Sequence, residues 1–213
     1  MSSQSRTVTL DRLAEILRVR SAEGRILVAM AGPPGCGKST CAEGLVESLN
    51  AEAPGSAMVF PMDGYHYDDQ VLLERGLRSR KGAPETFDVA GLAHMLKRLR
   101  RNEEAEIAVP VFDRDLEISR AAARMIPRTV RIIIVEGNYL LLDRHPWAGL
   151  VPLFDVRVMI RTPAEVLRER LIARWEGFGL PPGEVATKVE GNDLPNGRLV
   201  ISDSIEAELE VVT

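Results

Sequence analysis

Short apolar runs alternate with helical patterns along most of this chain. Four runs, at residues 26–31, 57–60, 131–135 and 156–160, have the length and apolar content of buried parallel strands. Between them, apolar residues recur at the three- and four-residue spacing of amphipathic helices. This alternation predicts an α/β fold of three layers, in which a mostly parallel central sheet lies between helices.

The helices are located by their apolar faces and their end signals. Spacing predicts one helix that begins near Leu10 and that Gly24 ends, one over residues 40–50, and one that begins at Asp88. A fourth is expected from Thr162-Pro163-Ala164-Glu165, which matches a capping box with proline at the first helical position.

Other stretches have weaker patterns. Residues 107–112 resemble a strand that contains Pro110, which favours an edge position, and residues 125–128 are a short extended piece. Residues 65–86 have no clear periodicity. After a return helix over 181–190, we expect a polar stretch at 191–197 and a last strand at 199–201. The polar stretch is either a plain turn or a wall of the nucleotide or substrate pocket.

Length and composition narrow the possible classes of protein. With 213 residues and 45% hydrophobic content, the chain can bury one substantial core, so a single domain is expected over residues 1–213. A formal charge of −4 with mixed signs disfavours a nucleic-acid partner. No apolar run approaches the roughly 20 residues of a membrane span, and residues 1–9 lack the core of a signal peptide, so we expect no membrane partner and a cytoplasmic location. Cys36 and Cys41 are expected to be reduced.

The strongest chemical signal is the stretch that we call the phosphate loop, residues 32–39. Its sequence, Gly32-Pro33-Pro34-Gly35-Cys36-Gly37-Lys38-Ser39, matches G-x-x-x-x-G-K-[ST] between a predicted strand and a predicted helix. Glycines let backbone N–H groups point at phosphate oxygens, and the helix start adds partial positive charge. These residues and Thr40 are therefore expected to bind the phosphates of ATP, with a plain glycine-rich turn as the alternative.

Two acidic residues follow predicted strands. Asp63 comes after residues 57–60 and Glu136 after residues 131–135, so both are expected at the sheet edge where ligands bind in such folds. Asp63 is the candidate catalytic base for a substrate hydroxyl, or else a turn-forming residue before Gly64. Glu136 and Ser39 are the candidate ligands of Mg²⁺. Lys38 is expected to reach the terminal phosphates.

Several cationic residues are also candidates for the site. Arg170 and Arg174 lie four apart on a predicted helix and are candidates for neutralising a moving phosphoryl group, although a solvated face is the alternative. Gly177 and Gly179 are candidate hinges of a small helical lid over about 163–192. The cluster Arg75, Arg78, Arg80 and Lys81 precedes Gly82 and suggests a substrate loop.

Several stretches together resemble one family. GPPGCGKS, PMDGYHY, PETFD, PVFDR, IIIVEGNYLLLD, RERLIARW and NDLPNGRLV are similar to the phosphoribulokinase/uridine kinase/bacterial pantothenate kinase family of P-loop kinases, from about residue 24 to 202. The sequences of these stretches are most similar to a branch labelled fructokinase or fructose-transport-associated kinase. The resemblance implies a base at Asp63, an acidic residue at Glu136 and lid arginines at Arg170 and Arg174. Substrate contacts are expected from Tyr65, His66, Arg114 and Asn138.

The resulting expectation is an ATP-dependent kinase with Mg²⁺ that phosphorylates a hydroxyl of a small metabolite, with a sugar such as fructose favoured. Pantothenate, a nucleoside or a phosphorylated metabolite are alternative acceptors, and the cationic cluster favours the last of these. A nucleotide-dependent switch is the alternative of another class, although the chain lacks the N-K-x-D guanine motif. A homodimer remains open.

Overall fold

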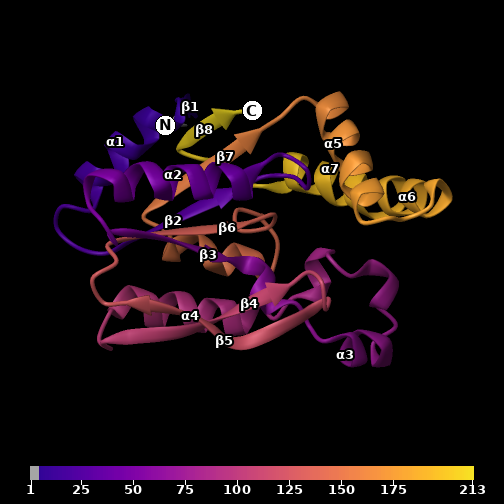
Figure 1. Ribbon diagram of the computed structural model, residues 1–213, viewed down its shortest axis with the longest axis horizontal. Coiled ribbons are helices and arrows are strands. Elements are labelled where there is room, and N and C mark those ends of the chain that lie inside the picture. Colours follow the sequence, from indigo (N-terminus) through magenta and orange to yellow (C-terminus); the bar gives the residue numbers. More distant parts are fainter. Residues whose placement is uncertain (1–4) are drawn as a thin grey trace.

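The computed structural model describes residues 5–213, and the first four residues of the polar N-terminus lie outside that range. Its centre is a sheet of six strands in the order β1-β8-β7-β2-β6-β3, and every neighbouring pair is parallel (Figure 1). The strands are β1 (Arg6–Thr7), β2 (Ile26–Ala31), β3 (Ala57–Pro61), β6 (Ile132–Gly137), β7 (Val156–Arg161) and β8 (Leu209–Val212).

Helices cover both faces of this sheet, which gives the three layers (Figure 1). On one face lie α1 (Leu10–Arg20) and α2 (Lys38–Glu52), and on the other lie α4 (Val89–Arg101) and the 3₁₀ helix η4 (Trp147–Leu153). The remaining helices are α3 (Asp69–Glu74), α5 (Ala164–Gly177), α6 (Pro182–Lys188) and α7 (Leu194–Asp203). The chain therefore has the predicted α/β fold.

The central strand β2 explains why the strands are apolar throughout. Its alternate side chains point to opposite faces. Leu27 and Ala29 belong to the hydrophobic core beneath α4, whereas Val28 and Met30 belong to the core beneath α1 and α2. Because both faces are buried, β2 and β6 carry no exposed residue.

A two-stranded antiparallel hairpin packs beside α4, outside the main sheet (Figure 1). It consists of β4 (Glu106–Asp113) and β5 (Ile118–Pro127), and its register shifts between Val109 and Val111, around Pro110. The predicted irregular strand is confirmed, and the piece expected at 125–128 is the end of the much longer β5.

A small helical unit, α5 and α6 with a π-helical turn η5 (Val189–Asp193), lies at the end of the molecule beyond the carboxyl ends of the strands (Figure 1). Its own hydrophobic cluster is formed by Leu171, Val185 and Val189, apart from the two main cores.

The last predicted strand was wrong. Residues 194–203 form α7, and the polar turn expected at 191–197 is divided between η5 and α7. Only Val200 of the apolar triplet 199–201 is buried, while Ile201 is half exposed, which is a helical burial pattern. Pro195 lies in the first helical turn, where proline is well tolerated. The true last strand is β8.

Two local predictions were also wrong. Pro163 precedes α5, and no side chain caps that helix; the Thr162 hydroxyl instead contacts Cys36 O at 3.3 Å. The first helix ends at Arg20, four residues before Gly24. The stretch 65–86 contains α3 and the 3₁₀ turns η2 (Arg78–Arg80) and η3 (Pro84–Thr86), each too short to give a periodic signal.

Both cysteines are buried, and they form no disulfide with each other. Among residues 5–213, no helix combines the length and the apolar character that a membrane crossing requires.

Close packing at Gly64 holds the 3₁₀ turn η1 (Met62–Tyr65) against the hairpin. A Cβ atom at Gly64 would lie 2.7 Å from Pro110 O, a backbone atom that cannot rotate away. We predict that Gly64→Ala lowers the free energy of unfolding by about 1–3 kcal/mol through overpacking. Gly44→Ala, inside α2 with no atom within 4 Å of the new Cβ, is the matched control and should raise it by about 0.5–1 kcal/mol. Urea denaturation of both variants tests this; equal effects would contradict it.

Candidate active site

The phosphate loop connects β2 to α2 at the carboxyl edge of the sheet. Gly35 and Gly37 have φ of 81° and 80°, values that other residues rarely adopt, and Gly37 precedes the first turn of the 15-residue α2. A Cβ at Gly32 would lie 2.6 Å from the Cys36 sulfur, so that position is also restricted by packing. The loop amides thus stand at the positive end of a long helix, the arrangement that binds phosphate groups.

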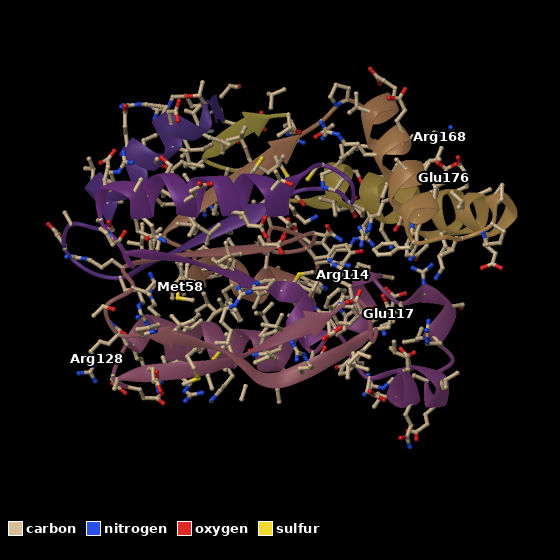
Figure 2. All side chains as sticks on the ribbon, in the orientation of Figure 1. Met58, Arg114, Glu117, Arg128, Arg168 and Glu176 are labelled. Carbon is tan, nitrogen blue, oxygen red and sulfur yellow. The ribbon has the colours of Figure 1, made fainter. Side chains whose placement is uncertain are left out.

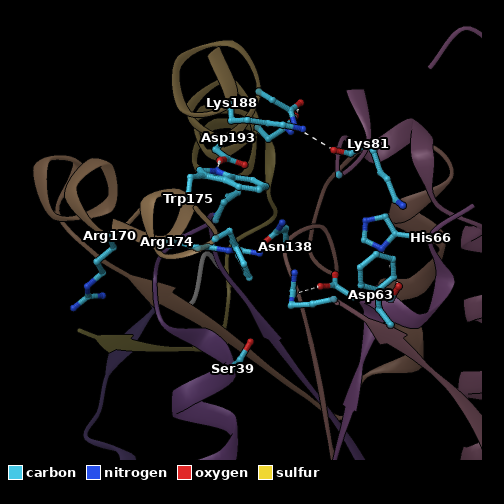
Figure 3. A pocket seen from close by; sticks show the side chains of 18 of the residues that line it. Ser39, Asp63, His66, Lys81, Asn138, Arg170, Arg174, Trp175, Lys188 and Asp193 are labelled. Carbon is cyan, nitrogen blue, oxygen red and sulfur yellow. Dashed lines mark hydrogen bonds and ion pairs between the residues drawn. The ribbon is translucent and has the colours of Figure 1, made fainter. Parts of the chain in front are cut away.

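A cavity of about 670 Å³ opens in front of this loop, between α5, α7 and the hairpin (Figure 3). Six predicted nucleotide-binding residues line it: Pro34, Gly35, Gly37, Lys38, Ser39 and Thr40. The other three, Gly32, Pro33 and Cys36, are buried loop residues that do not line the cavity.

The two predicted acidic residues lie in this cavity, on neighbouring strands. Glu136 is the fifth residue of β6, and its register partner on β3 is Pro61, two residues before Asp63. Ser39 Oγ donates a hydrogen bond to Glu136 Oε2 at 3.2 Å. A hydroxyl and a carboxylate are hard oxygen donors that suit Mg²⁺, which keeps several water or phosphate ligands besides. The donor set therefore fits the metal.

The environment separates the pKa values of the two acids. Burial, followed by the charge of Asp63, raises the pKa of Glu136. Burial also opposes ionisation of Asp63, but the positive charges around it outweigh burial and lower its pKa. The nearest is Arg114, whose Nη2 lies 2.7 Å from Asp63 Oδ2. Asp63 is thus the ionised partner of the pair.

Three predicted arginines reach the cavity from two sides (Figures 2 and 3). Arg114 comes from the connection between β4 and β5, while Arg170 and Arg174 come from α5. Burial lowers the pKa of Arg174, and the charge of Arg114 lowers it further. Arg170 Nη1 lies 3.5 Å from the Thr213 hydroxyl. Arg168, by contrast, pairs with Glu190 outside the cavity.

The remaining predicted contacts divide into two groups. His66 and Asn138 line the cavity, whereas Tyr65 does not; its ring packs edge-on against Phe60 at 6.0 Å. His66 Nδ1 lies 2.8 Å from Asp63 O, and burial lowers the pKa of the ring. Asn138 Oδ1 is buried without a hydrogen-bond partner among the described residues.

The cationic cluster before Gly82 is largely neutralised. Asp69 accepts hydrogen bonds from Arg78 and Lys81, which outweigh burial and lower its pKa. Arg80 pairs with Glu85, and the Arg75 guanidinium stacks over the Tyr67 ring at 4.4 Å. Of the four, Arg78 and Lys81 line the cavity.

Sequence reasoning missed the apolar walls of the cavity. On the hairpin side, the His66 ring packs against Phe87 and Phe112, with centroids 4.0 and 4.7 Å away. On the opposite side, Trp175 Nε1 donates to Asp193 Oδ2 at 2.6 Å. Isolated aromatic residues carry no sequence signal for such a wall. Asn192 and Asn196 also line the cavity, in agreement with the expectation that the stretch 191–197 forms a wall of the pocket.

Comparison with known proteins agrees with this geometry. A family model described as "Phosphoribulokinase / Uridine kinase family" matches residues 27–175. The Escherichia coli (strain K12) protein named "Uncharacterized protein YggC" is 37% identical over 197 residues, which are 92% of this chain and 81% of that protein. A Schizosaccharomyces pombe protein named "Putative uridine kinase C227.14" is 30% identical over 207 residues, 93% of this chain and 86% of its own.

A solved structure is similar over nearly the whole chain. It is named "putative fructose transport system kinase from Silicibacter sp. TM1040", and it superposes with a TM-score of 0.87 at 38% identity, covering 95% of this chain and 98% of its own. The relatives' names differ in substrate, but the family match covers the phosphate loop, both acidic residues and the start of the helical unit. The chain therefore belongs to the phosphoribulokinase/uridine kinase family of P-loop kinases.

Proposed function

We propose that this protein is an ATP-dependent kinase that transfers the γ-phosphoryl group to a hydroxyl of a small, uncharged polyhydroxy metabolite, with fructose as the first candidate. The observation that carries the proposal is a single cavity lined by both the phosphate loop and the ionised Asp63. A nucleotide and an acceptor bound there would meet between Lys38 and Asp63.

The chain's own residues account for the main steps. Asp63 accepts the proton of the acceptor hydroxyl while the oxygen of that hydroxyl attacks the γ-phosphorus and ADP leaves. Such general base catalysis typically raises the rate by about 10²–10⁴-fold. Lys38, Arg170 and Arg174 neutralise the negative charge of the phosphates in the transition state. Ser39 and Glu136 would hold Mg²⁺, which supplies further neutralisation of phosphate charge.

Charge pairing favours a neutral acceptor over a phosphorylated one. Arg78, Lys81 and Arg114, the cations nearest the hairpin wall, already have acidic partners. Cavity cations without an ion pair among residues 5–213 are Lys38, Arg170, Arg174 and Lys188, all on the phosphate loop or the helical unit. Phe87, Phe112 and His66 give this side of the cavity a largely uncharged lining, which suits a neutral acceptor.

The helical segment over about 163–192 is proposed to act as the lid of this single domain. Leu171, Val185 and Val189 hold α5, α6 and η5 together, while Leu167 of α5 packs into the core beneath α1 and α2 and would be the fixed end of the lid. Lid closure would exclude water from the cavity.

The first experiment measures ATP-to-ADP conversion with Mg²⁺ against fructose, other sugars, pantothenate, nucleosides, ribulose 5-phosphate and nucleoside monophosphates. We expect strong stimulation by a neutral polyol and loss of turnover in Lys38→Ala. Stimulation by a phosphorylated acceptor would refute the neutral-acceptor proposal, and acceptor-independent hydrolysis would favour a nucleotide-dependent switch.

Asp63→Asn keeps the size of the side chain but removes its ability to accept a proton. We predict that kcat falls by about 10²–10⁴-fold while ATP affinity, measured by calorimetry, stays within about twofold. A variant that retained full activity would show that the base lies elsewhere. Asp68→Asn, a carboxylate outside the cavity that caps α3, is the matched control.

Trp175 reports on the lid, because it lines the cavity while Trp147 is buried in the main core. We predict that ATP changes the tryptophan fluorescence of the wild type and that Trp175→Phe abolishes the change while leaving the emission of Trp147. A change of equal size in Trp175→Phe would contradict the proposed movement.

A further inference from the structure

Two asparagines link the helical unit to the loop at residues 78–87, which we call the 78–87 loop. Asn196 Nδ2 lies 3.2 Å from Asn192 Oδ1, and Asn192 Nδ2 lies 3.1 Å from Lys81 O. Asn192 is in the π-helical η5 and Asn196 in the first turns of α7, and both line the cavity. Asn196 is only 4% exposed, which is unusual for this residue type.

The backbone carbonyl at one end determines the orientation of both amides. Lys81 O can only accept, so the Asn192 atom facing it must be the NH₂ group. Asn192 then presents its oxygen to Asn196, which must donate with its own NH₂ group. Asn196 Oδ1 is therefore left as a hydrogen-bond acceptor, and it has no partner among the described residues.

The pair connects the side of the cavity at the phosphate loop with the side at the 78–87 loop. Gly197, next to Asn196, lies against the phosphate loop, since its Cβ would be 3.5 Å from that of Pro33. Asn192 reaches the other half, and its Nδ2 would lie 3.8 Å from a Cβ at Gly82. A π-helical turn inside a helix often marks a functional site, and here it places Asn192 at the cavity.

An amide oxygen at this position selects the kind of group that it binds. It repels phosphate oxygens, which are also acceptors, and it is satisfied by an O–H or N–H donor. Lys38 and the loop amides are suited to the phosphates, so the donors left are the hydroxyls of the acceptor and the ribose and adenine groups of the nucleotide. The link from Asn196 through Asn192 to Lys81 O favours the acceptor, because Lys81 also contacts Glu117 O in the connection between β4 and β5.

We propose that Asn196 Oδ1 accepts a hydrogen bond from a hydroxyl of the acceptor, and that Asn192 is the positioning residue that orients it. This inference rests on the proposed kinase function and adds the residue that distinguishes one acceptor hydroxyl from another. The relay also ties recognition of that hydroxyl to the 78–87 loop, because Asn192 is held by Lys81 O.

The test uses ATP-to-ADP conversion by the full chain with D-fructose and with fructoses that each lack one hydroxyl. Loss of a hydrogen bond costs about 1–3 kcal/mol, so Asn196→Ala should lower kcat/KM for fructose by about 5–150-fold. The KM for ATP should stay within about twofold. Arg198→Ala, an exposed residue of α7 outside the cavity, is the control and should change neither constant.

The deoxy sugars separate a direct contact from a structural effect. One of them should be a poor substrate of the wild type, yet Asn196→Ala should cause no further loss with that sugar. Asn192→Asp, which has the same shape but cannot donate to Lys81 O, should raise the KM for fructose and leave the KM for ATP unchanged. The double variant Asn192→Asp/Asn196→Ala should have almost the same KM for fructose as Asn196→Ala alone.

The possible failures are distinguishable. Fructose turnover that Asn196→Ala leaves intact, or equal losses with every deoxy sugar, would overturn the inference and leave the kinase proposal standing. Wild-type protein that binds ATP but turns over no fructose would overturn the proposed acceptor and this inference together. Thermal unfolding of each variant establishes that the protein assayed is folded.

Discussion

Two carboxylates at the ends of neighbouring strands impose the main constraint on this structure. Asp63 and Glu136 are both enclosed by the protein, and the charge of Asp63 adds to burial in raising the pKa of Glu136. The charges that lower the pKa of Asp63 come from separate elements: His66 directly after η1, Arg114 from the hairpin, Lys38 from α2 and Arg174 from α5. The hairpin and the helical unit are thus held at the sheet edge by electrostatics as well as by packing.

The same constraint gives the two acids different chemistry. Asp63 has a direct cationic partner in Arg114 and stays ionised, whereas Glu136 has only the Ser39 hydroxyl as a hydrogen-bond partner among the described residues. A divalent cation beside Glu136 would supply the charge that the protein does not, and this is consistent with a donor set of hydroxyl and carboxylate oxygens. The uneven distribution of cations thus supports the proposed roles, a base for Asp63 and a metal ligand for Glu136.

The sequence predicted the fold wherever burial on two faces makes a strand continuously apolar, as in β2 and β6. It also predicted that Lys38, Asp63 and Glu136 share one edge, because parallel strands bring their carboxyl ends together. It failed at Leu199–Ile201, since a three-residue apolar run fits a strand and a helix equally well. The ion pairs of Arg78 and Lys81 with Asp69 depend on tertiary folding of short turns, which no periodicity reveals.

The cavity has one half at the phosphate loop and another towards the hairpin, and the two halves differ in charge and shape. This difference favours a different substrate in each half. The half at the phosphate loop has unpaired cations and inward-facing amides, so it favours the polyanionic nucleotide. Towards the hairpin, Asp69 compensates the cations and the walls are the rings of Phe87, His66 and Phe112, so a second polyanion would gain little there. An uncharged acceptor that binds against such a wall loses less solvation free energy than a phosphate ester does. Its hydroxyls then need partners, and the unpaired amide oxygen of Asn196, which Asn192 links to Lys81 O on the hairpin side, would be one acceptor for them.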